Sequence, residues 1–191
     1  MAAPLGDVVT ERLDLRRFRL GDEAVLGPVF AKPEVWRFPY GRGLGAAETA
    51  EFVASQRRHW DECGFGCWVV AERSGGRVVG YAGLSVPRFL PEILPAVEVG
   101  WRLDPDVWGR GYATEAATAA LDEAFTTLGL DEVCSVPQSE NPASVRVAVR
   151  LGLWLDRTVT IPPTDRRGAV SGDIYRIRRS EWANRPRDQV P

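Results

Sequence analysis

Residues 97–117 read VEVGWRLDPDVWGRGYATEAA, and this stretch decides how the rest of the sequence is interpreted. Apolar and polar residues alternate over 97–103, which is the pattern of a strand with one buried face. Asp, Pro and Asp at 104–106 turn the chain. Apolar residues then recur at helical spacing over 113–128, and a glycine follows. The stretch therefore predicts a strand, a tight turn and a long helix.

Two glycines, Gly109 and Gly111, lie immediately before this predicted helix. Glycines beside a helix start allow backbone N–H groups to converge on an anion, and the helix dipole adds about half a positive charge there. The functional interpretation is a diphosphate cradle made mostly of main chain. A Gly-x-Gly turn before a helix is also an ordinary way to connect a strand to a helix, so the tripeptide alone leaves both interpretations open.

The remaining elements follow from periodicity and turn residues. Strands are predicted at 10–18, 67–71, 78–82, 97–103, 132–136, 154–161 and 173–178. Helices are predicted at 21–30, 46–60, 113–128 and 141–151, the last with Asn141 as N-cap. This order predicts a mixed sheet with helices on its faces, of the α/β or α+β class. The 191 residues form one expected domain, with a core over about 10–182 and a loose tail over 183–191.

Composition excludes several classes of function. The formal net charge of −2 and the pI of about 5.6 argue against a nucleic-acid partner. No stretch reaches the length of a membrane span, and the start resembles no signal peptide. Three cysteines fit a reducing cytoplasm, and the rarity of lysine suggests a GC-rich bacterial source. His59, Cys63 and Cys67 provide too few ligands for zinc, so no metal is expected, and His59 remains only a minor candidate as a base.

The residues around the two glycines resemble the sequence motif of a known family. Trp108-Gly-Arg-Gly-Tyr-Ala113 resembles the acetyl-CoA signature of the GNAT superfamily, in its RimJ/RimL branch of ribosomal-protein N-terminal acetyltransferases. Trp108 stands where the wider consensus has Gln or Arg. Residues 141–153 resemble the helix of this family that begins with Asn-x-x-Ser and ends in Leu-Gly-Phe, and 175–182 resemble the last strand of the branch. The resemblance covers about 10–182.

The resemblance implies a fold, a reaction and a binding site. It implies one mixed, mostly antiparallel sheet with helices on both faces, which splays between its fourth and fifth strands, 97–103 and 132–136. It implies acetyl-CoA as donor and direct attack by a primary amine, either a protein N-terminus or a small molecule, in a ternary complex. The residues implied to bind acetyl-CoA are Val99, Gly100, Trp101, Arg102, Leu103, Trp108, Gly109, Arg110, Gly111, Tyr112, Ala113, Thr114, Asn141 and Ser144.

Two residues are candidates for proton transfer. Glu98, on the polar face of the 97–103 strand, is expected to accept through water the proton that an alkylammonium must lose before it attacks, and the resemblance supports this role because the family has glutamate on this strand. The alternative is an exposed strand glutamate, or one paired with Arg102. Ala148 stands where many superfamily members have a tyrosine that acts as a general acid. The branch that the chain resembles has a serine three residues after the Asn, which implies that Ser144 hydrogen-bonds the sulfur and relays a proton. The alternative is a first-turn serine that bonds locally.

The acceptor is the least defined part of the site. The aromatic cluster Trp36, Arg37 and Tyr40 falls in a loop that borders the acceptor groove in this superfamily, although the loop could equally pack against the sheet. The absence of an acidic run argues mildly against polyamines. A homodimer is plausible for this branch. The missing tyrosine leaves a second possibility, a non-catalytic regulatory module that binds acyl-CoA.

Overall fold

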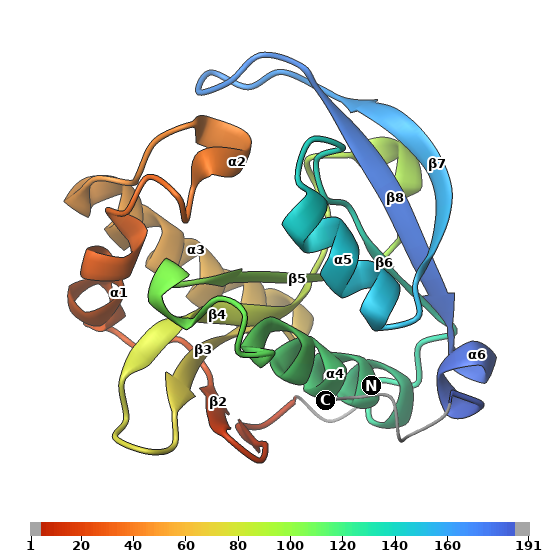
Figure 1. Cartoon of the computed structure of the whole chain (residues 1–191), viewed down its shortest axis with the longest axis horizontal. Coiled ribbons are helices and arrows are strands. Elements are labelled where there is room, and N and C mark those ends of the chain that lie inside the picture. Colours follow the sequence, from red (N-terminus) through yellow and green to blue (C-terminus); the bar gives the residue numbers. More distant parts are fainter. Residues whose placement is uncertain (1–4, 186–191) are drawn as a thin grey trace.

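The computed structural model describes residues 5–185, which form one eight-stranded sheet with helices on both sides (Figure 1). The sheet order is β1-β2-β3-β4-β5-β6-β8-β7. The strands are β1 Val8–Val9, β2 Leu13–Arg16, β3 Cys67–Glu72, β4 Val78–Ser85, β5 Glu98–Leu103, β6 Glu132–Ser135, β7 Trp154–Ile161 and β8 Val170–Arg178. The helices are α1 Asp22–Phe30, α2 Arg37–Tyr40, α3 Ala46–Cys63, α4 Tyr112–Thr126, α5 Pro142–Arg150 and α6 Arg179–Ala183, with 3₁₀ turns η1 Pro91–Ile93 and η2 Pro105–Val107.

The central strands are apolar on both faces because helices cover both faces. In β3, Trp68 and Val70 belong to the core beneath α4, whereas Cys67 and Val69 belong to the core beneath α1 and α3. All four side chains are buried. The continuous apolar run of β3 is thus typical of a strand in a sheet that lies between two layers of helices. Apolar and polar residues do not alternate along β3 because both of its faces are buried.

The strands β5 and β6 separate almost as soon as they meet. All neighbouring strands pair in antiparallel fashion except these two, which are parallel and share a single register pair, Glu98 with Cys134. Beyond that pair the remainder of β5 has no strand beside it on the β6 side. The splay that the family resemblance implied is therefore present.

The predicted elements are confirmed, with changes at their ends. The expected strand over 10–18 is shorter in the structure, Leu13–Arg16, because Thr10 and the residues after it form a turn. In this turn the Thr10 hydroxyl donates to the Leu13 carbonyl and accepts the Leu13 N–H. The expected strand over 173–178 begins earlier, at Val170, because it lengthens a hairpin with β7. The short helices α2 and α6 were not predicted. The expected loose tail lies outside the described residues from 186 onward, and Ala183 ends α6.

The β7–β8 hairpin is the longest feature outside the layered core. It extends from the far edge of the sheet toward α2 and α3 (Figure 1). Its tip is tied to α3, since Arg166 forms ion pairs with Glu51 at 2.9 Å and Glu48 at 3.7 Å. Among the described residues, none of the helices is long and apolar enough to cross a membrane.

Asp104 fixes the turn that joins β5 to α4. Asp104 is 2% exposed, and its carboxylate accepts hydrogen bonds from Lys32 Nζ at 2.6 Å and Arg77 Nη2 at 2.8 Å. It also caps η2 by accepting the Asp106 N–H. Burial by itself would raise the pKa of Asp104, but the hydrogen bonds from Lys32, Asp106 and Arg77 outweigh it, and the pKa lies below the ordinary 3.8. The turn is thus held by contacts from two other segments and by its own cap.

We expect Asp104→Asn to lower the free energy of unfolding at pH 7 by about 1–3 kcal/mol, since charge-assisted hydrogen bonds are lost at a buried site. The pKa of Asp104 is lower in the folded chain than in the unfolded chain, so its stabilisation is complete above about pH 4 and is lost as the pH falls through the folded pKa. Urea unfolding of both proteins at several pH values measures the difference. The difference should shrink below pH 4, and Asp131→Asn, at a carboxylate that is 95% exposed, serves as control.

Candidate active site

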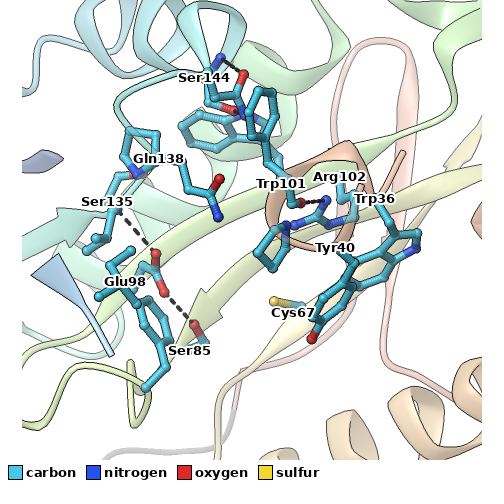
Figure 2. A pocket seen from close by; sticks show the side chains of 18 of the residues that line it. Trp36, Tyr40, Cys67, Ser85, Glu98, Trp101, Arg102, Ser135, Gln138 and Ser144 are labelled. Carbon is cyan, nitrogen blue, oxygen red and sulfur yellow. Dashed lines mark hydrogen bonds between the residues drawn. The ribbon is translucent and has the colours of Figure 1, made fainter. Parts of the chain in front are cut away.

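A cavity of about 350 Å³ opens where β5 leaves β6 (Figure 2). Its walls come from α2, α3, the central strands, the segment between β6 and α5, and the tip of the β7–β8 hairpin. Of the predicted site residues, the cavity brings together Trp36, Tyr40, Glu98, Gly100, Trp101, Arg102, Asn141 and Ser144. Segments that are far apart in the sequence thus meet at the splay.

Glu98 lies at the apex of the splay and reaches the cavity (Figure 2). One carboxylate oxygen accepts the Val136 N–H at 3.2 Å, and the other faces the Ser85 hydroxyl at 3.4 Å. Burial raises the pKa of Glu98 to about 7, while the bonds from Val136 and Ser85 and the charge of Arg102 hold it from rising further. Among the described residues no cation lies within ion-pair distance of this carboxylate, so neither alternative for Glu98, an exposed glutamate or an Arg102 pair, is what the structure contains.

Ser85 is a site residue that the sequence did not reveal. It stands opposite Glu98 in the antiparallel register of β4 and β5. Gln138 is a second, and its side chain points into the cavity (Figure 2). Only the strand pairing identifies Ser85, because thirteen residues separate it from Glu98 and no local motif links the two.

Asn141 and Ser144 form a small hydrogen-bonded unit at the start of α5. The Asn141 side-chain oxygen accepts the Ser144 N–H at 3.2 Å, which confirms Asn141 as N-cap. The Asn141 side-chain amide donates to the Ser144 hydroxyl oxygen at 3.0 Å. Because that oxygen already accepts a hydrogen bond, the hydroxyl proton is available to donate into the cavity that both residues line.

Arg102 is turned to the aromatic side of the cavity. Its guanidinium donates to the carbonyls of Val35 and Phe38 and to the Tyr81 hydroxyl, and it lies 4.0 Å from the centre of the Trp36 ring. These contacts tie β5 to the segment between α1 and α2. The side chain of Arg102, which the resemblance implied as an acetyl-CoA ligand, therefore holds the segment around Trp36 against β5.

The backbone of β5 presents alternate N–H groups to opposite sides. The Asp104 N–H donates to the Val79 carbonyl of β4 at 2.7 Å, and the register of the two strands fixes the rest. The N–H groups of Gly100 and Arg102 face β4, whereas those of Trp101 and Leu103 face the open side of the splay. The Leu103 carbonyl on that side accepts the Trp108 indole N–H at 2.9 Å. The splayed edge therefore retains main-chain donors.

The predicted diphosphate cradle has the required backbone. Gly109 and Gly111 have φ values of 78° and 82°, which favour glycine, and no side chain caps the N-terminus of α4. A Cβ at Gly109 would meet nothing within 4 Å, while one at Gly111 would lie 3.3 Å from the Arg12 guanidinium. The first N–H groups of a helix have no partner within it, so those of residues 112–114 are available to an anion.

The side chains of the cradle point elsewhere. Tyr112 and Thr114 are buried, and the Tyr112 hydroxyl donates to Glu72 at 3.0 Å. Arg110 is exposed. Glu115, in the first turn of α4, accepts from Arg12 Nε at 2.6 Å and does not cap the helix. The residues present thus suit an anion held by main chain, with the Arg12 guanidinium nearby.

The three predicted acceptor residues do not share one place. Trp36 is 5% exposed and stacks on Tyr40 with ring centres 5.7 Å apart, and both line the cavity. Arg37 is exposed and does not line the cavity. The loop therefore both packs against the sheet and forms a wall of the cavity, which combines the two interpretations of the sequence.

The other candidate residues, His59 and Cys67, are poorly suited to take a proton from an amine at neutral pH. His59 packs edge-on against Phe65 outside the cavity, and burial lowers its pKa. Cys67 lines the cavity, but burial raises its pKa to about 12. No group of three or more His, Cys, Asp or Glu side chains among the described residues could hold a metal ion.

Comparison with known proteins agrees with this geometry. A sequence model described as an acetyltransferase (GNAT) domain matches residues 12–153. The chain is 31% identical over 153 residues to the uncharacterised protein YkkB of Bacillus subtilis, covering 80% of this chain and 87% of that protein. The crystal structure of an acetyltransferase from Agrobacterium tumefaciens matches with a TM-score of 0.72 and 29% identity, over 91% of this chain and 94% of that one.

A ribosomal-protein-S5-alanine acetyltransferase from Vibrio fischeri has the same fold, with a TM-score of 0.72 at 15% identity over 94% of this chain and 99% of that one. The family match covers most of the chain, and the matched residues hold both the splayed strands and the helix N-terminus with its glycines. The matched residues also include Glu98 at the apex of the splay. This chain is an acetyltransferase of the GNAT family.

Proposed function

We propose that this enzyme transfers an acetyl group from acetyl-CoA to a primary amine by direct attack in a ternary complex, and that Glu98 takes the proton from the amine. The observation that carries the proposal is a carboxyl group with a pKa of about 7 at the apex of the splay, inside the cavity. A base with a pKa near the working pH is the most effective proton acceptor. The acceptor is either a protein N-terminus or a small-molecule amine.

The main chain around Gly111 supports binding of the donor. The free N–H groups at the start of α4 would hold the diphosphate, and those of Trp101 and Leu103 would face pantetheine and the thioester carbonyl along the open edge of β5. Asn141 and Ser144 line the same cavity from the other side of the splay. The donor would therefore lie between the separated strands.

The acceptor enters as an ammonium ion, because alkylamines have pKa values well above 7. Glu98 in its ionised form takes one proton, directly or through water, and the nitrogen attacks the thioester carbon. The carbonyl oxygen becomes an oxyanion that the N–H groups of the open β5 edge stabilise. The C–N bond forms, the C–S bond breaks, and the nitrogen releases its second proton.

The departing thiolate accepts a proton as the amide forms. The Ser144 hydroxyl is oriented as a donor by Asn141 and would hydrogen-bond this sulfur. The thiolate is a good leaving group with a pKa near 8.5, so the contribution of Ser144 is small compared with that of Glu98. The products are an acetamide, CoA and one proton.

Thiol release from acetyl-CoA with panels of peptides and small amines tests this proposal, with products identified by mass spectrometry. Acetylated amine together with free CoA is the expected result. Binding of acetyl-CoA without turnover on any amine would instead identify a regulatory module, and the proposed activity would be wrong.

We expect Glu98→Gln to lower kcat/KM at pH 7 by roughly 100-fold, as for loss of a general base. In the unaltered enzyme the rate should rise with pH through an ionisation at about 7, because only the ionised carboxylate accepts a proton. The variant should lack this step, and its deficit should shrink as the pH approaches the pKa of the amine. Steady-state kinetics from pH 5.5 to 9.5 measures both.

Acetyl-CoA binding by calorimetry is the control, and Glu98→Gln should leave the affinity nearly unchanged. Glu92→Gln, at a carboxylate that is 55% exposed on η1, is a matched variant outside the cavity. An identical pH profile in Glu98→Gln and the unaltered enzyme would remove Glu98 from the mechanism.

We expect Gly111→Asp to weaken CoA binding by more than about 100-fold, because it places a β-carbon and a negative charge where the amides converge. Arg110→Ala should weaken binding by less than about tenfold, since an exposed side-chain charge contributes little. Isothermal calorimetry with CoA measures both variants. Circular dichroism melting shows whether Gly111→Asp folds, since its φ of 82° disfavours aspartate.

The contrast between the two variants distinguishes main-chain binding from side-chain binding. If Arg110→Ala loses most of the affinity while a folded Gly111→Asp keeps it, a charged side chain rather than the amides binds the diphosphate.

A further inference from the structure

One charged side chain in the cavity lining, Arg167, has neither a role in the proposed reaction nor an ion-pair partner among the described residues. Among its described lining residues, the side chains with a formal charge are Glu98, Arg102 and Arg167. Glu98 takes the amine proton in the proposed function. Arg102 is engaged by two carbonyls, a hydroxyl and the Trp36 ring. Arg167 is therefore the positive charge to be explained.

Arg167 lies at the tip of the β7–β8 hairpin, and its guanidinium has few partners. Nη1 donates to the Gly168 carbonyl at 3.0 Å, and no carboxylate among the described residues lies within 4.0 Å of it. Its neighbour Arg166 is instead paired with Glu51 and Glu48 of α3. The ion pairs of Arg166 hold the hairpin tip over the cavity and leave the Arg167 guanidinium with most of its donors unused.

Apolar and aromatic side chains also line the cavity, among them Trp36, Tyr40, Phe89 and Ile161. The cavity thus offers a proton acceptor at Glu98 and spare donors at Arg167 within one lining.

We propose that the acceptor is a small amine that carries a carboxylate at the other end of an apolar or aromatic segment, and that Arg167 binds this carboxylate. The inference rests on the proposed function and adds the substrate class to it. The ammonium end would lie at Glu98 and the carboxylate end at the hairpin tip, so that each charge of the substrate meets an opposite charge. Arg167 would then determine specificity without taking part in proton transfer.

The test compares amino carboxylates with their carboxamides, which have the same shape without the charge. The pairs are 4-(aminomethyl)benzoate and a series of ω-amino carboxylates of increasing length, each with its amide. We expect the unaltered enzyme to prefer the carboxylate in kcat/KM by roughly 10- to 100-fold, the factor of a charge-assisted hydrogen bond. The preference should weaken with salt, because Arg167 lies at the rim of the cavity.

Arg167→Gln should abolish the preference by lowering the carboxylate rate and leaving the amide rate unchanged, which also shows that the variant folds. Arg167→Lys should keep part of it, since a lysine retains the charge without the planar fork. Arg157→Gln, at an exposed arginine of β7 outside the cavity, is the matched control and should keep the full preference.

Three outcomes would overturn the inference. The first is a carboxylate preference of the same size in Arg167→Gln, and the second is no preference in the unaltered enzyme. The third is turnover confined to peptides or other amines without a carboxylate, in which case the proposed acetyltransferase activity remains correct. Failure of every amine and peptide to release thiol would contradict the proposed function itself.

Discussion

The parting of β5 from β6 is the constraint on which the rest of the structure depends. The two strands share one register pair, at Glu98 and Cys134, and then diverge. Main-chain groups along the remainder of β5 lose the partner that a closed sheet would provide, and buried groups of this kind need another one. The opening therefore creates both a cavity and a row of donors beside it. A sheet paired along its full length would have neither.

The same divergence sets the chemistry of Glu98. The carboxyl group lies at the last point of contact between the strands, where protein surrounds it on most sides, and burial raises its pKa to about 7. The Val136 N–H and the Ser85 hydroxyl favour the ionised form and limit the rise. Burial outweighs these contacts, so the protonated and ionised forms of Glu98 are nearly equally populated near neutral pH. Burial at the apex thus gives this glutamate its raised proton affinity, and among the described residues no cation lies close enough to form an ion pair that would lower it.

A single strand organises both sides of the site because its residues alternate. Val99 and Leu103 are buried in the core beneath α4, whereas Glu98, Gly100 and Arg102 line the cavity. Arg102 fastens the opposite wall to the strand, and Asp104 beyond it fastens the turn that leads to the glycines. The Glu98 carboxyl, the aromatic wall of the cavity and the start of α4 are thus positioned by neighbouring residues of one segment.

The sequence by itself determined the order of the longer elements, their apolar faces and the glycine turn before α4. These depend on local spacing, such as the alternation over 97–103 and the glycines before 112. Capping by Asn141 was equally local and is present. The splay and the proposed role of Glu98 came from family resemblance, since no periodicity encodes a missing strand partner.

Only the tertiary structure decided which distant side chains share the cavity. Ser85 meets Glu98 through strand register, and Arg167 arrives on a hairpin anchored to α3 by Arg166. It also showed that Arg37 points away while Trp36 and Tyr40 form the wall. Such contacts join residues from 13 to 115 positions apart and depend on how several elements pack at once. Hydrophobic spacing and turn residues act within a few positions of the chain, so a sequence pattern can predict the local elements. The same pattern does not specify which distant side chains come into contact.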